Sequence, residues 1–162
     1  MDKGDCAYKR SQSGVTLVEL LIVLAVVATV AGMAAAGYSS YIDTSRIDAA
    51  KRDIIEIASH IERYHLTTNS WPTDLSTAGI PNKEDPWGNL YIYARIPTLV
   101  GQIQTGNTMI RQDANLRPIN TFYDLYSKGA DGDTTNNISA PKSHDDVIRA
   151  RDGDFLGLAR DY

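Results

Sequence analysis

The sequence predicts an α+β protein in which one long N-terminal helix packs on a small antiparallel β-sheet. Two observations support this fold: an apolar run merges into an amphipathic stretch with no proline before Pro72, and short strand-like segments follow. The chain has 162 residues, which is room for one domain of ordinary size. Its composition, 43% hydrophobic and 22% charged, is that of a globular protein, and its net charge of −4 does not predict nucleic-acid binding.

The apolar run begins the predicted helix and is long enough to cross a membrane. Between residues 15 and 42 the only charged residue is Glu19. About 20 residues span the hydrocarbon core, so residues 15–42 are a predicted transmembrane segment. A buried core helix is one alternative, but a domain of this size rarely hides so uniform a helix. A secretory signal peptide is a second alternative, because the small residues after the run resemble a signal-peptide cleavage site.

Charges near the run predict its orientation and one functional residue. Lys9 and Arg10 precede the run, and the positive-inside rule places them in the cytoplasm. The residues after the run are then expected to face the periplasm or the exterior. A carboxylate in the apolar layer is costly, so we expect Glu19 to be paired or functional. The alternative is a glutamate that reaches the cytoplasmic headgroups.

Beyond the membrane segment, the predicted helix continues as an amphipathic segment over residues 43–68. Its apolar residues recur every three or four positions. They are Ile47, Ala50, Ile54, Ile57 or Ala58, Ile61 and Tyr64. One helix of this length extends roughly 80 Å, and its second half is expected to pack on a head formed by residues 69–162. The small residues from Gly32 to Gly37 are compatible with either close helix packing or a softened helix.

The head is predicted to contain turns and short strands. Residues 69–74 end the helix, and residues 85–89 form a second turn. The strand candidates are residues 90–96, 99–104, 109–112 and 121–126. A small antiparallel sheet against the helix is the economical arrangement for these elements.

Aspartates concentrate in the last third of the chain. Sixteen of the 20 acidic residues are Asp, and nine of these lie from Asp113 onward. Two groups stand on polar loops, at residues 128–133 and 143–147. Oxygen ligands of this kind suit calcium, which takes about six to eight of them. An EF-hand does not fit, because its twelfth position, counted from Asp131, is Lys142 rather than Glu. Solvated turn residues are the alternative interpretation.

The stretch Gly14-Val15-Thr16-Leu17-Val18-Glu19, followed by the apolar run, resembles the class III leader of type IV pilins and pseudopilins. The resemblance implies that residues 1–14 are a leader, that a prepilin peptidase cleaves after Gly14, and that the new N-terminus, Val15, is methylated. The family usually has Phe at that position. The resemblance also implies that Glu19 makes an assembly contact with the amine of a neighbouring subunit. The only cysteine, Cys6, lies in the leader, so the mature chain has none.

Two motifs in the head resemble the major pseudopilin of type II secretion systems. They are Asp-Pro-Trp-Gly-Asn at residues 85–89 and Tyr-Asp-Leu-Tyr-Ser-Lys-Gly-Ala-Asp-Gly at residues 123–132, the latter followed by Asp-Asp-Val at residues 145–147. The resemblance implies a bound calcium ion (Ca2+). Its implied ligands are the carboxylates of Asp131, Asp145 and Asp146 and the main-chain carbonyls of Lys128 and Val147. Calcium is then expected to raise the melting temperature of residues 43–162.

The resemblance implies a structural subunit rather than an enzyme, and the chain has no nucleotide-binding loop or hydrolase nucleophile motif. Such a subunit crosses the inner membrane once, with its head in the periplasm. It then polymerises through its N-terminal helix into a helical pseudopilus that drives type II secretion across the outer membrane. The implied partners are further copies of the chain, minor pseudopilins, the inner-membrane assembly platform and the prepilin peptidase. The alternative is a type IV pilin or minor pilin of a surface fibre for adhesion, motility or DNA uptake.

Overall fold

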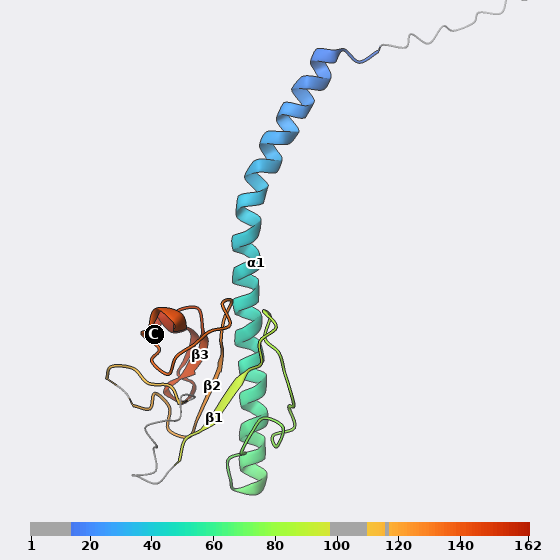
Figure 1. The fold of residues 1–162 in the computed structure, drawn as a ribbon. Coiled ribbons are helices and arrows are strands. Elements are labelled where there is room, and N and C mark those ends of the chain that lie inside the picture. Colours follow the sequence, from blue (N-terminus) through green and yellow to red (C-terminus); the bar gives the residue numbers. More distant parts are fainter. Residues whose placement is uncertain (1–13, 98–109, 116) are drawn as a thin grey trace, which may run out of the picture. The chain divides into compact units, whose positions relative to one another are not determined.

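The computed structural model describes residues 14–97, 110–115 and 117–162, apart from the side chains of residues 34–37. The described chain forms one long helix, α1 (Leu17–Thr68), and a four-stranded sheet. The strands are β1 (Ile92–Arg95), β2 (Tyr123–Ser127), β3 (Val147–Ala150) and β4 (Phe155–Leu158), with short 3-10 turns at Pro141–Ser143, Arg151–Gly153 and Ala159–Asp161 (Figure 1). The predicted α+β fold is confirmed. The predicted leader up to residue 13 and the strand candidate at 99–104 lie outside the described residues.

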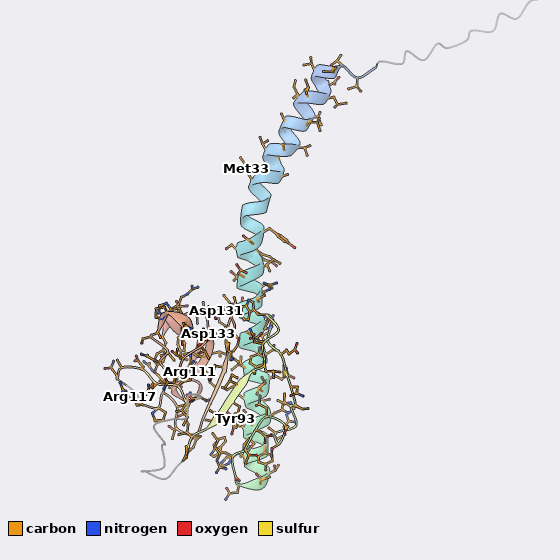
Figure 2. The ribbon with its side chains drawn as sticks, viewed as in Figure 1. Met33, Tyr93, Arg111, Arg117, Asp131 and Asp133 are labelled. Carbon is orange, nitrogen blue, oxygen red and sulfur yellow. The ribbon has the colours of Figure 1, made fainter. Side chains whose placement is uncertain are left out.

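The helix α1 begins at a threonine cap and continues as an apolar segment. The Oγ1 of Thr16 accepts a hydrogen bond of 3.2 Å from the N–H of Glu19, which satisfies one of the free N–H groups at the helix start. The chain divides into two compact units, Met1–Tyr41 and Ile42–Tyr162, so the first half of α1 belongs to the first unit. In that unit Leu17, Val27 and Met33 are more than half exposed. Met33 is labelled on α1 in Figure 2. The helix is long and apolar enough here to cross a membrane, by length and composition.

The second half of α1 buries the face that the sequence periodicity predicts. The buried residues on this face are Ala50, Ile54, Ile57, Ala58 and Ile61. Ile55 lies on the other face and is 59% exposed. The helix ends where Asn69 adopts a left-handed conformation, with φ of 52°, and donates its N–H to the carbonyl of His65 at 2.8 Å. A left-handed Asn or Gly is a common way to end a helix.

The sheet is antiparallel, with the order β1–β2–β3–β4, and it lies beside the second half of α1 (Figure 1). Leu125 and Val147 point toward α1 and complete a core with the buried helix face. Tyr126 and Ile148 point to the opposite face and pack in a second apolar cluster with Ile138. Successive side chains along a strand point to opposite faces of the sheet. The two apolar clusters therefore cover the two faces.

The strands differ from the sequence prediction at the C-terminal end of the chain. The candidates at 90–96 and 121–126 contain β1 and most of β2, whereas β3 and β4 were not predicted. Residues 110–112, the described end of the candidate at 109–112, make one bridge from Gln112 to Asn137 instead of a strand. β3 contains Arg149 and β4 contains Gly157, so the sequence of neither strand shows a clear strand pattern. Pairing with neighbouring strands stabilises both of them instead.

Candidate functional site

The predicted processing segment lies at the tip of the described chain. Gly14, Val15 and Thr16 precede α1 and are not helical, and Val15 is 72% exposed. The peptide bond between Gly14 and Val15 is therefore outside the helix. Glu19 lies in the first turn of α1, where a carboxylate interacts favourably with the positive end of the helix dipole. Thr16 and Glu19 have the spacing of a capping box, in which both residues cap the start of the helix. This local role of Glu19 was not predicted from the sequence.

The first head motif, residues 85–89, folds around a buried carboxylate. Asp85 is 5% exposed, and its Oδ1 accepts hydrogen bonds from the N–H groups of Trp87 and Asn89 at 3.0 and 2.9 Å. Its Oδ2 accepts a hydrogen bond of 2.5 Å from the hydroxyl of Ser127, the last residue of β2. Asp85 therefore shapes its own turn and attaches that turn to the second head motif.

Asn89 fixes the turn that follows β2. Its Nδ2 donates to the carbonyl of Gly129 at 3.0 Å, and a Cβ on Gly132 would lie only 2.9 Å from its Oδ1. There is even less space for a side chain at Gly129 than at Gly132. A Cβ at Gly129, whose φ is 66°, would lie 2.3 Å from the carbonyl oxygen of Asp145. The two head motifs and the Asp145 segment, which are far apart in sequence, thus meet in one place.

The exposed aspartates of the loop bind backbone N–H groups and a lysine. Asp145 Oδ2 accepts the N–H of Asp131 at 3.0 Å, and Asp131 Oδ1 accepts the N–H of Asp133 at 2.8 Å. Lys142 forms an exposed ion pair of 2.5 Å with Asp133. The lysine lowers the pKa of the Asp133 carboxyl, which also accepts the N–H of Thr134. The structure therefore brings Asp131 and Asp145 together through a hydrogen bond between a backbone N–H and a carboxylate.

Asp146 lies in a buried polar cluster with Arg111 and Thr134. It is fully buried, and its Oδ2 accepts hydrogen bonds from Nη2 of Arg111 and, at 2.6 Å, from the hydroxyl of Thr134. Burial raises the pKa of the Asp146 carboxyl to about 6, and the charge of Arg111 opposes that rise. Sequence reasoning missed Arg111, because it lies 35 residues from Asp146 within a stretch interpreted as a strand.

The surroundings of Asp146 do not fit a divalent cation. Calcium takes about six to eight oxygen ligands, whereas one oxygen of Asp146 already binds both Arg111 and Thr134. A cation on Asp146 would also lie near the guanidinium, and two buried positive charges repel each other strongly. Across residues 14–97, 110–115 and 117–162, no three His, Cys, Asp or Glu side chains are grouped so that they could hold a metal ion. Of the predicted carbonyl ligands, Lys128 follows β2 and Val147 begins β3.

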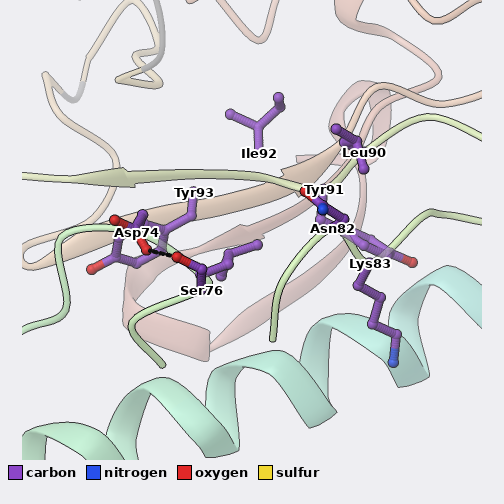
Figure 3. A pocket seen from close by; sticks show the side chains of 9 residues that line it. Asp74, Ser76, Asn82, Lys83, Leu90, Tyr91, Ile92 and Tyr93 are labelled. Atoms are coloured by element: carbon purple, nitrogen blue, oxygen red, sulfur yellow. Dashed lines mark hydrogen bonds between the residues drawn. The ribbon is translucent and has the colours of Figure 1, made fainter. Parts of the chain in front are cut away.

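A separate hollow of about 320 Å³ lies beside β1 and is shown in Figure 3. Its charged groups already have partners within the chain. Lys83 forms ion pairs with Asp53 at 3.0 Å and Glu56 at 2.5 Å. Asp74 accepts a hydrogen bond of 2.6 Å from Ser76, drawn as a dashed line in Figure 3. The hollow therefore presents no set of free groups that indicates a particular ligand.

Comparisons with known proteins agree with the processing segment. A family model described as the prokaryotic N-terminal methylation motif matches residues 9–35. Type II secretion system core protein G of Pseudomonas aeruginosa is 28% identical, over 76% of this chain and 87% of the relative. A fimbrial protein of Neisseria meningitidis serogroup A is 26% identical, over 87% of this chain and 81% of the relative. The type IV major pilin protein PilE of Neisseria gonorrhoeae is 33% identical over 43% of this chain. No solved structure matches the chain.

The methylation motif and the helix-plus-sheet fold define the class of type IV pilin-like proteins. The chain resembles that class, and it is similar to the type II secretion system core protein G over 76% of its length. The predicted resemblance is thereby confirmed.

Proposed function

We propose that the processed chain is a structural subunit that polymerises through its N-terminal helix into a periplasmic pseudopilus for type II protein secretion. The observation that carries this proposal is the N-terminal methylation motif at residues 9–35, which includes much of the apolar half of α1. The similarity to core protein G supports a pseudopilus in particular, because it covers 87% of that relative and so includes its head.

The proposed function comprises three steps. The apolar half of α1 first anchors the chain in the inner membrane, with the head in the periplasm. A prepilin peptidase then cleaves the accessible bond between Gly14 and Val15, and Val15 is methylated. In the filament, the apolar half of α1 packs against other copies, and Glu19 pairs with the amine of a neighbour. Minor pseudopilins and the inner-membrane assembly platform are the further partners in this proposal.

A surface pilin is the second candidate, because the fimbrial relative from Neisseria meningitidis matches 87% of this chain. The mature chain, from Val15 onward, has no cysteine, whereas pilins more often close the C-terminal region with a disulfide. Deleting the gene distinguishes the two functions. Loss of secreted proteins from the medium with surface fibres intact supports the pseudopilus, and loss of fibres with normal secretion supports the pilin.

Two substitutions test the proposed processing and assembly. Gly14→Ala is expected to block leader removal, seen as an unprocessed band in an immunoblot of membranes. Glu19→Ala is expected to allow processing but to abolish filaments when the pseudopilus is overproduced, because the helix loses its only carboxylate within the apolar run.

Each substitution has a control at another position, within α1. Gly32→Ala adds a methyl group to open space and should be processed normally, although it too replaces a glycine. Glu56→Ala removes a 59% exposed carboxylate outside the apolar run and should assemble normally. Normal filaments from both Gly14→Ala and Glu19→Ala contradict the proposed function.

A further inference from the structure

Arg111 contacts several parts of the aspartate-rich loop at once. Its Nη1 donates to the hydroxyl of Thr134 and the carbonyl of Thr135, each at 2.5 Å, and its Nη2 donates to Asp146. Its backbone N–H donates to Asp124 of β2 at 2.6 Å. The guanidinium also lies over the ring of Tyr126, another residue of β2, at 4.3 Å from the centroid. One cationic side chain thus joins the loop to the sheet.

The ion pair between Arg111 and Asp146 is fully enclosed. The side chains are 1% and 0% exposed, respectively. Nε of Arg111 and Oδ1 of Asp146 are buried without a hydrogen-bond partner. One atom is a donor and the other an acceptor, so a bridging water or a two-bond pairing satisfies both. A divalent cation would satisfy Oδ1 alone and would bring a second positive charge beside the guanidinium.

The other aspartates of the loop also have partners within the chain. Lys142 pairs with Asp133, and Asp131 and Asp145 each accept a backbone N–H group. Among these contacts of the loop, only the ion pair between Arg111 and Asp146 is buried. Removing one partner of this pair therefore leaves the other charge buried and unpaired. The buried ionic contact of the loop is therefore the one with Arg111.

We propose that the Arg111 guanidinium, rather than a bound divalent cation, neutralises Asp146 and holds residues 128–147 against β2. The chain itself then supplies the positive charge that the family resemblance assigns to calcium. The loop is stable without calcium, and the head is indifferent to the calcium concentration of its compartment. This proposal concerns the head alone and does not depend on filament assembly.

Calcium dependence of the melting temperature tests the proposal on the unmodified chain. The full chain in detergent micelles is heated in millimolar calcium chloride and, separately, in chelator. Fluorescence of Trp71 and Trp87 reports on the head, because both side chains pack against its core. The expected result is the same melting temperature in both solutions. A higher melting temperature in calcium overturns the proposal.

A double-mutant cycle in chelator tests the ion pair itself. Arg111→Met and Asp146→Asn should each lower the melting temperature by about 10 °C or more, because each leaves one buried charge unpaired. The double variant should melt above either single variant, since it leaves neither charge. Lys142→Met, which removes the exposed cation of the same loop, is the control and should shift the melting temperature by only about 2 °C or less.

Additive losses in the double variant overturn the proposed pairing. If the single variants do not fold, the calcium comparison on the unmodified chain still decides the matter.

Discussion

Gly129 is the residue around which the aspartate-rich loop closes. Its left-handed conformation favours glycine, and the carbonyl oxygen of Asp145 occupies the space where a Cβ would lie. Asp145 in turn accepts the N–H of Asp131. A side chain at position 129 therefore has to displace the segment that leads into β3.

We expect Gly129→Ala to lower the free energy of unfolding of the head by at least about 3 kcal/mol, from strain and a backbone collision together. Gly79→Ala is the matched control. Gly79 has a similar left-handed φ, 85°, but open space around it, so its cost should be about 1–2 kcal/mol. Denaturant unfolding followed by tryptophan fluorescence measures both. Equal losses contradict the close contact with Asp145.

At this scale the sequence predicted some residues and missed others for a physical reason. The resemblance placed Asp131 and Asp145 in one loop, and they do interact. Asp146 was also identified, but its partner Arg111 lies 35 residues away. The pairing of Arg111 with Asp146 depends on how the folded sheet brings distant segments together. The spacing of residues along the chain does not predict such a pairing.

The helix is the element that the sequence predicted best, because its signals are local. Apolar residues spaced by three and four positions define the buried face of the second half. Turn residues mark its end near Asn69. β3 and β4 are different, since four residues with an internal Arg or Gly carry little pattern of their own. They become strands through pairing, which only the folded sheet provides.

The buried face of α1 gives a prediction at the scale of the element. Ile57 is fully buried in the core between α1 and the sheet, and Ile57→Ala should lower the free energy of unfolding by about 2–5 kcal/mol. Ile55→Ala, on the exposed face, should change it by about 0.5 kcal/mol or less. Thermal and denaturant unfolding of both variants in detergent provide the measurement. Similar losses for the two variants contradict the assigned helix face.

The whole molecule combines two units with opposite solvent requirements. In the unit that ends at Tyr41 the described large apolar side chains are exposed, and the unit from Ile42 encloses its own core on both faces of the sheet. Average composition conceals this division, because 43% hydrophobic residues is an ordinary value for a globular protein. The order of the residues revealed the division, since the apolar run and the amphipathic stretch are adjacent but distinct.

This division predicts how a shortened chain behaves. A chain that starts at Ile42 should remain in solution without detergent and melt at nearly the same temperature as the full chain does in micelles. The full chain should require detergent, because its exposed apolar helix otherwise associates. Size-exclusion chromatography and tryptophan fluorescence test this. Aggregation of the shortened chain shows that the head depends on the first unit.

The cap at Thr16 has a consequence for processing. The proposed cleavage between Gly14 and Val15 would remove neither Thr16 nor Glu19, whose N–H donates to the hydroxyl of Thr16 in the uncleaved chain. What the cut alters is charge: a neutral peptide group is replaced by an amine next to the positive end of the helix dipole, which disfavours cations. The carboxylate of Glu19 is one turn away. In the proposed function, leader removal would therefore change the charge at the start of a helix that is already formed, and Glu19 would gain a matching positive charge only in the processed chain.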